Sequence, residues 1–190
     1  MRDTRQELLM EAELLVRGRG YSGFSFAQLA QAVGIRKASI HYYFHTKDDL
    51  AIALVAAYDA RYDAALAAIM ASSADGLARI DAYGQLYLEG VERRLGCLCA
   101  VLATEFDLLP ESLRADIARF FAKHIAWLEQ VLREGIANGT IAADIDPARA
   151  ARVIIATLEG ALMLERVMAG GDGFRTVLDG LKKSLEPGRD

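Results

Sequence analysis

Residues 25–47 read SFAQLAQAVGIRKASIHYYFHTK, and this stretch decides the fold. Its apolar positions predict two short helices joined by a tight turn at Gly34, followed by the start of a third helix. The second short helix is rich in side chains that bind phosphates or base edges, namely Arg36, Lys37, Ser39, His41, Tyr42 and Tyr43. Two short helices in this order form a helix-turn-helix, which places one helix in the major groove of DNA.

Three capping signals mark where helices begin near the N-terminus. In each, a hydroxyl residue is followed three positions later by an acid or amide: Thr4-x-x-Glu7, Ser25-x-x-Gln28 and Thr46-x-x-Asp49. We therefore expect helices over about 4–17, 26–33 and 37–44, and a fourth that begins after Thr46. Gly18 and Gly20 are expected to end the first of them.

The rest of the chain also predicts helices, so the expected fold class is all-α. Ala and Leu dominate, and the 190 residues include only three prolines. Asp146 followed by Pro147 is a strong helix-start signal. Breaks are expected at SSADG (72–76), Gly96, Pro110, NGT (138–140) and GGDG (170–173). The expected helices cover about 47–71, 77–94, 97–109, 111–138 and 147–169, with a last one that ends near Leu185.

The charge distribution separates the first 47 residues from the remainder. The whole chain has a formal net charge of −4, but residues 1–47 carry +3 and the other 143 residues carry −7. This asymmetry predicts a small DNA-binding domain at 1–47 on an acidic helical body at 48–190. Because +3 is a modest charge, the prediction depends mainly on the helix-turn-helix residues.

The composition predicts a cytoplasmic protein with no membrane segment. No apolar stretch approaches the roughly 20 residues of a membrane-spanning helix. The N-terminal MRDTRQELLM lacks the apolar run of a signal peptide. Cys97 and Cys99 are too close together to link distant elements, which fits a reducing compartment.

The predicted recognition helix has an inner and an outer face. Ile40 and Phe44 lie one turn apart and are expected to face the core, which leaves the opposite face for DNA. Lys47 lies in the first turn of the next helix, where its ammonium group and the helix dipole favour a phosphate. The candidate DNA contacts are Ser25, Gln28, Arg36, Lys37, Ala38, Ser39, His41, Tyr42, Tyr43 and Lys47. The alternative is a helical hairpin whose polar side chains are merely solvated.

Residues 5–50 resemble the tetracycline-repressor (TetR) family of bacterial regulators. The similarity lies in Gly20-Tyr21, in SFAQLAQAVGI and in RKASIHYYFHTKDDL. The chain departs from the usual family pattern at Arg36, which replaces a small hydroxyl residue, and at Ala38, which replaces a frequent glycine. It also has His41 where tyrosine is commonest. These three departures concern the operator sequence that the protein reads. The resemblance itself implies a fold of about nine helices, the first three of which bind DNA.

The resemblance also implies that residues 48–190 form an effector-binding and dimerisation domain, and that the homodimer closes through its last two helices. The sequence supports self-association independently, because the helix from Pro147 is apolar around most of its circumference. Its three-four spacing predicts a dimer interface at Ala151, Ile154, Leu158, Ala161, Leu162 and Glu165. The alternative is that this face packs inside the chain's own core.

Members of the family typically bind a small molecule between helices, and binding alters DNA affinity. The candidate effector residues are aromatic or polar: Tyr58, Tyr62, Tyr83, Tyr87, Glu105, Phe106, His124, Trp127, Glu159 and Met163. Each is also compatible with an ordinary core or surface position. The two acids would either receive a cationic ligand or be satisfied by a nearby arginine.

The expected function is a transcriptional regulator, most simply a ligand-released repressor that binds a palindromic DNA operator as a dimer. No nucleophile elbow, phosphate loop or metal motif occurs, so no catalysis, metal or cofactor is expected. Activation instead of repression, and regulation without a ligand, stay open. So does redox sensing at Cys97 and Cys99, although free cysteine is often a small buried hydrophobe.

Overall fold

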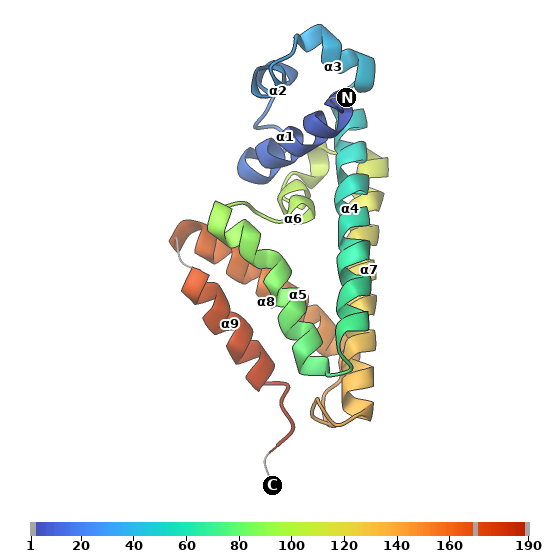
Figure 1. Ribbon diagram of the computed structural model, residues 1–190, viewed down its shortest axis with the longest axis vertical. Helices are drawn as coiled ribbons and strands as arrows, with labels where there is room; N and C mark the ends of the chain where they lie inside the picture. Colours follow the sequence, from blue (N-terminus) through green and yellow to red (C-terminus); the bar gives the residue numbers. More distant parts are fainter. Residues whose placement is uncertain (1–2, 169–170, 189–190) are drawn as a thin grey trace. The chain divides into compact units, whose positions relative to one another are not determined.

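The computed structural model describes residues 3–168 and 171–188, which are helical almost throughout (Figure 1). The helices are α1 (Thr4–Arg19), α2 (Phe26–Val33), α3 (Lys37–Tyr43), α4 (Lys47–Ser72), α5 (Gly76–Arg93), α6 (Leu98–Ala103), the 3-10 helix η1 (Phe106–Leu108), α7 (Glu111–Ala137), α8 (Pro147–Met168) and α9 (Gly171–Lys183). No strand occurs in the described ranges, and the predicted all-α class is confirmed. No helix in these ranges is both long enough and apolar enough to cross a bilayer.

The first helix begins at a different cap from the predicted one. Asp3 is the N-cap, and its carboxylate accepts a hydrogen bond from the backbone N–H of Gln6 at 3.1 Å. The predicted box at Thr4 is therefore wrong, because the backbone N–H of Glu7, which this box would use, donates to the backbone carbonyl of Asp3 at 3.0 Å. The helix continues past Gly18 and ends at Gly20, whose φ of +84° favours glycine.

Helices α2 and α3 form the predicted pair around a turn at Gly34. Ser25 and Gln28 make a complete capping box at the start of α2, and Gly34 ends this helix in the left-handed conformation. Helix α3 ends one residue earlier than predicted. The predicted box at Thr46 and Asp49 is also present, since each backbone N–H donates to the side chain of the other residue, at 2.9 and 3.0 Å. Local signals thus set these helix boundaries.

The chain divides into two compact units. The first contains residues up to 61 together with 96–120, so α6 and the start of α7 belong with α1–α3 and the first part of α4. Its apolar core includes Leu8, Leu29, Ile40, Leu54 and Leu102, each at most 1% exposed. This unit extends beyond the predicted segment 1–47.

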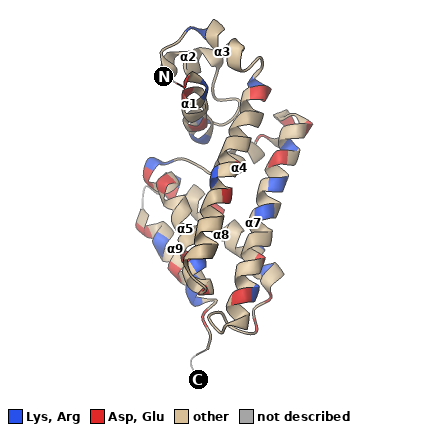
Figure 2. Ribbon diagram, turned by 45° about the vertical axis from the view of Figure 1, so that its right-hand side comes forward, with Lys and Arg blue, Asp and Glu red and all other residues tan. Residues whose placement is uncertain are grey.

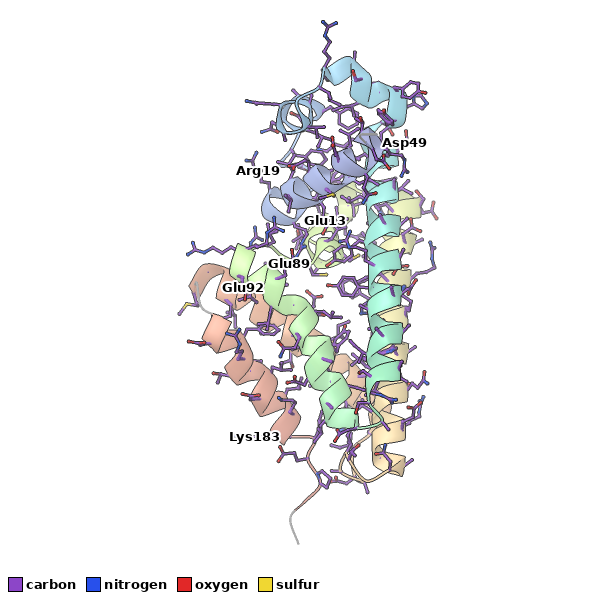
Figure 3. All side chains as sticks on the ribbon, in the orientation of Figure 1. Glu13, Arg19, Asp49, Glu89, Glu92 and Lys183 are labelled. Atoms are coloured by element: carbon purple, nitrogen blue, oxygen red, sulfur yellow. The ribbon has the colours of Figure 1, made fainter. Side chains whose placement is uncertain are left out.

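Glu13 on α1 (Figure 3) binds two arginines in the first unit. Arg17, one turn later, donates to its carboxylate at 3.1 Å, and Arg61 of α4 donates to both carboxylate oxygens at 2.8 Å. Arg17 also donates through Nε to the carbonyl of Gly96 at 2.8 Å. The cluster therefore attaches α1 to α4 and to the segment that leads into α6.

The second unit contains residues 62–95 and those from 121 onwards. Within it, α5, α8 and α9 lie side by side (Figure 1). Gly84 of α5 allows α9 to approach, because a Cβ there would lie 2.6 Å from Leu178. The predicted end of the α8 helix at Ala169 and the first residue of the GGDG break lie outside the described residues, and Gly171–Gly173 form the first turn of α9 instead of a break.

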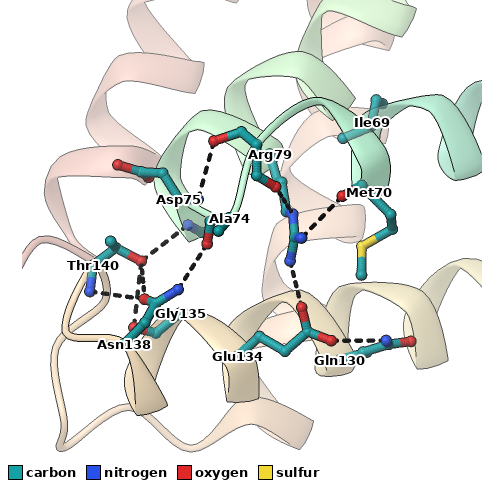
Figure 4. A network of polar contacts seen from close by, with 12 residues as sticks. Ile69, Met70, Ala74, Asp75, Arg79, Gln130, Glu134, Gly135, Asn138 and Thr140 are labelled. Atoms are coloured by element: carbon teal, nitrogen blue, oxygen red, sulfur yellow. Dashed lines mark hydrogen bonds and ion pairs between the residues drawn. The ribbon is translucent and has the colours of Figure 1, made fainter.

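Arg79 connects the turn between α4 and α5 to α7 (Figure 4). Its guanidinium donates to the carbonyls of Ser73 at 2.6 Å and Met70 at 3.0 Å, and to the carboxylate of Glu134 at 2.5 Å. Arg79 is only 7% exposed, so these partners are what allow a charged group to be buried here.

Candidate functional site

The outer face of α3 is open, as predicted. Ile40 is 0% exposed and Phe44 is 3% exposed, so these two residues anchor the helix to the core. The other side chains from residue 36 to residue 43 are exposed. Helix α2 carries no charged residue, and α3 carries only Lys37, with Arg36 at its N-cap (Figure 2). Neutral hydrogen-bonding groups therefore make up most of this surface.

His41 is held in place although it is exposed. Its Nδ1 atom lies 3.1 Å from the backbone carbonyl oxygen of His45. Its ring also meets the ring of Phe26 edge-on, with centroids 5.2 Å apart and an interplanar angle of 61°. These two contacts fix the imidazole on the open side of α3.

Tyr42 and Tyr43 are the large aromatic residues of this face. Tyr42 is 82% exposed and Tyr43 is 36% exposed, and their rings meet edge to face with centroids 5.1 Å apart. A phenol hydroxyl suits a phosphate oxygen, and a ring suits a thymine methyl group. Their positions are compatible with the predicted contacts.

Ser25 and Gln28 already hydrogen-bond to each other. The backbone N–H of Ser25 donates to Gln28 Oε1 at 2.9 Å, and the N–H of Gln28 donates to Ser25 Oγ at 3.4 Å. Their first role is therefore to begin α2, and any DNA contact would be additional to that role.

Lys47 has partners inside the first unit that the sequence does not reveal. Its Nζ donates to the carbonyl of Phe24 at 2.6 Å and lies 4.3 and 4.7 Å from the ring centroids of Phe24 and Tyr21. Burial lowers the pKa of this ammonium group, although Glu105 and Asp48 act in the opposite direction. The side chain therefore ties the α1–α2 loop to the start of α4, and its predicted phosphate contact stays a prediction.

Two carboxylates hold the same loop. Tyr21 donates its hydroxyl to Asp48, and burial together with this carboxylate raises the pKa of Tyr21 far above its usual value. Glu105 accepts the backbone N–H of Ser22 at 3.0 and 3.3 Å. Burial acts to raise the pKa of Glu105, but the hydrogen bonds from Ser22 and Tyr21 and the charge of Lys47 outweigh burial and lower it. The Glu105 carboxylate therefore holds the loop, and its predicted effector role stays a prediction.

Six of the ten predicted effector residues come together in the second unit. They are Tyr62, Tyr83, Tyr87, His124, Trp127 and Glu159. The Tyr83 hydroxyl lies 2.9 Å from His124 Nδ1 and 3.3 Å from the Tyr87 hydroxyl. Tyr87 in turn donates to Glu159 Oε1 at 3.3 Å. Hydrogen bonds thus connect α7, α5 and α8.

Aromatic rings adjoin this chain of hydrogen bonds. The Tyr62 ring lies 5.2 Å from the His124 ring, and the Trp127 indole stacks on Tyr83 at 5.4 Å, between centroids. The indole N–H of Trp127 is buried and finds no acceptor in the part of the chain that the structure describes. We call these six residues the aromatic cluster.

The remaining predicted effector residues lie elsewhere. Tyr58 belongs to the first unit, where the guanidinium groups of Arg17 and Arg61 lie 5.9 and 5.2 Å from its ring centroid. Phe106 is 51% exposed and Met163 is 42% exposed. The prediction that these two side chains line an interior site is therefore corrected, because both lie at the surface.

The predicted dimer face of α8 is mostly interior. Five of its six residues are at most 3% exposed within the single chain: Ala151, Ile154, Leu158, Ala161 and Leu162. The prediction is wrong for these five, because they form core with the chain's own helices, and Glu165 is half-buried. The exposed apolar residues lie on other positions of the same helix: Val153, Met163, Leu164, Val167 and Met168.

A cavity of about 400 Å³ lies where α8 begins and α9 ends. Arg149, Val153 and Leu181 are among its lining residues, together with Asp144 and Asp146. No member of the aromatic cluster lines it. The cavity adjoins the exposed side of α8 through Val153.

The cysteines are buried, at 5% exposure for Cys97 and 0% for Cys99. Burial in apolar surroundings is typical of structural thiols, whereas redox-sensing thiols need access to solvent. No group of three or more metal-ligating side chains occurs within residues 3–168 and 171–188.

Two segments of this chain match known protein families. Residues 8–54 match the family described as bacterial regulatory proteins, tetR family, and residues 76–181 match the tetracyclin repressor-like C-terminal domain. The transcriptional regulator AcuR of Cereibacter sphaeroides is 32% identical over 149 residues, which cover 76% of this chain and 68% of AcuR. The transcriptional repressor NemR of Escherichia coli K12 is 27% identical over 187 residues, covering 96% and 94%. A TetR-family regulator from Agrobacterium tumefaciens has a TM-score of 0.91 and 30% identity, covering 96% and 97%.

Proposed function

Because this chain belongs to the tetR family of bacterial regulatory proteins, which are DNA-binding regulators and not enzymes, we propose that it is a ligand-responsive repressor. In this proposal a homodimer binds a palindromic operator in the cytoplasm, and a small molecule releases it. The observation that carries the proposal is the exposed outer face of α3, which buried Ile40 and Phe44 hold in place.

The outer face of α3 suits the major groove. The groove of B-DNA is about 12 Å wide and admits one α-helix. Arg36 at the N-cap carries the fork of donors that matches guanine O6 and N7. Lys37 and Tyr43 are suited to phosphates, which set the position of the helix without reading sequence. Tyr42, the most exposed of these aromatic residues, is suited to a base edge or a thymine methyl group.

A second copy of the chain would supply the second recognition helix. The exposed side of α8 carries apolar or small residues three or four positions apart, at Val153, Ala156, Gly160, Met163 and Val167. A Cβ at Gly160 of α8 or at Gly180 of α9 would meet nothing within 4 Å, so both positions leave room for a neighbouring helix. The proposed dimer interface is therefore this exposed stripe, where two copies of α8 and α9 would form a four-helix bundle. Half-sites would then lie about 34–36 Å apart or a multiple of that distance.

The aromatic cluster is the proposed effector site. Its rings would make apolar contacts with a small molecule. Its hydroxyl, imidazole and carboxylate groups would orient that molecule through hydrogen bonds. A buried donor without an acceptor costs about 1–3 kcal/mol. An effector that brings an acceptor to the Trp127 N–H would recover that cost. By binding better to a form with different half-site spacing, it would shift the population away from DNA.

The proposal is tested by fluorescence anisotropy with labelled DNA that flanks the protein's own gene. We expect salt-sensitive binding to a palindrome, weaker binding to DNA that carries only one of its half-sites, and much weaker binding to a scrambled sequence. A thermal-shift screen of small apolar metabolites, followed by the same assay, tests the ligand response. Trp127→Phe, which keeps an aromatic ring but removes the donor, is the matched variant. Compounds that stabilise the protein equally in both variants and leave DNA bound would contradict the proposed site.

A further inference from the structure

We infer that His41 is a specificity-determining residue that accepts a hydrogen bond from the exocyclic amino group of one base in each half-site. The base is adenine or cytosine, the two bases that present an amino donor in the major groove. The inference rests on the proposed function, because it requires α3 to lie in the groove of an operator.

The hydrogen bond to His45 assigns the histidine tautomer. A backbone carbonyl oxygen only accepts, so the His41 Nδ1 atom 3.1 Å from it must carry the hydrogen. A neutral imidazole carries one N–H group. Nε2 is therefore an acceptor with an available lone pair in the neutral ring.

The same contacts prepare the ring to read a base. The edge-on packing against Phe26 and the bond to His45 together restrict the imidazole, so less rotational freedom is lost on binding. Ala38 lies one helical turn before His41 and offers only a methyl group, which leaves the path to the base edges open. Both residues are exposed.

An acceptor at this position discriminates between bases in a way that a hydroxyl does not. Tyrosine, the commonest residue here in the family that the sequence resembles, both donates and accepts. An Nε2 lone pair attracts adenine N6 and cytosine N4, but it faces acceptors at guanine O6 and thymine O4. Replacing a hydroxyl by this imidazole thus narrows the choice at one position to a base with an amino group.

The test begins with an operator selected from random DNA by the full-length protein, in buffer near pH 8. At each position of one half-site, adenine is replaced by purine, which lacks the N6 amino group, or cytosine by 2-pyrimidinone, which lacks the N4 amino group. We expect one such replacement to weaken the wild-type protein roughly 5- to 100-fold, and the base involved distinguishes adenine from cytosine. His41→Ala should bind the two DNAs equally at that position. His45→Ala should retain the preference, because His45 acts through its backbone carbonyl.

Other outcomes overturn the inference. A preference at that position for guanine or thymine that disappears in His41→Ala would show that His41 donates instead. An unchanged preference in His41→Ala would show that it does not read sequence. Nitrogen-15 NMR of the free protein adds an independent measurement, and a hydrogen on Nε2 of neutral His41 would contradict the tautomer. Failure of the wild-type protein to bind any selected DNA would contradict the proposed function itself, which is a distinct result.

Discussion

Replacing Glu105 by alanine tests whether a carboxylate remote in sequence holds the loop between α1 and α2. Its two oxygens lie 3.0 and 3.3 Å from the backbone nitrogen of Ser22, 83 residues away. A hydrogen bond to a charged group contributes about 1.5–3 kcal/mol when it is well shielded. Glu105 is only half-buried, and solvent screening reduces the expected loss of unfolding free energy to about 1–2 kcal/mol. In a chain of this size the melting temperature should fall by roughly 2–8 °C.

Glu105→Gln separates the charge from the hydrogen bond, because an amide oxygen still accepts from Ser22. The folded-state pKa of Glu105 lies below its ordinary value of 4.5, so the ionised carboxylate stabilises the folded chain above that value. This stabilisation is lost as the pH falls through the lowered folded-state pKa. We therefore expect the difference in unfolding free energy between wild type and Glu105→Gln to be constant near neutral pH and to shrink below the ordinary value.

Urea unfolding followed by circular dichroism, repeated from neutral pH down to about pH 3, measures these differences. Asp107→Asn is the control, because this exposed carboxylate lies two residues further along the chain and should leave the stability unchanged. Wild-type stability of Glu105→Ala would refute the reasoning. So would a difference for Glu105→Gln that persists unaltered into acid.

Lys47→Ala should lower both the melting temperature and operator affinity, because it removes the bond to the carbonyl of Phe24. Lys37 is exposed, so Lys37→Ala should lower operator affinity without lowering the melting temperature. It should also reduce the slope of the logarithm of the binding constant against the logarithm of salt concentration by about one. Equal melting temperatures for the two variants would argue against the internal role of Lys47. Val167→Glu, at a position that is 84% exposed, should give monomers in sedimentation velocity with unchanged helix content, and surviving dimers would exclude the α8 stripe. Arg79→Lys should lower the urea midpoint, because an ammonium group cannot match the guanidinium's three directed bonds, and a wild-type midpoint would contradict this.

Features set by neighbouring residues could be predicted from the sequence. The capping box between Ser25 and Gln28 and the turn at Gly34 predicted both ends of α2 to the exact residue. The inward faces of Ile40 and Phe44 followed from their spacing, because the opposite face of α3 offers no large aliphatic residue. The cap of α1 was missed by one position because Asp3 and Thr4 are both good caps, and only the fold selects between them.

Features set by distant residues could not be predicted in this way. Lys47 finds its acceptor 23 residues away at Phe24, and Glu105 finds its donor 83 residues away at Ser22. The face of α8 was misassigned for a related reason. The helix is apolar on both sides, and its own sequence does not say which side α5 and α9 cover.

The two compact units share continuous helices, and this bears on how an effector would act under the proposed function. Helix α4 begins with Lys47 in the first unit and carries Tyr62 of the aromatic cluster in the second. Helix α7 likewise begins in the first unit and carries His124 and Trp127 in the second. An effector at the cluster therefore has no need to touch α3, whose outer face depends on contacts within the first unit alone. Release would then result from a changed distance between two intact recognition helices. The dimer would lose affinity for an operator with two half-sites, while each recognition helix would keep its base preference.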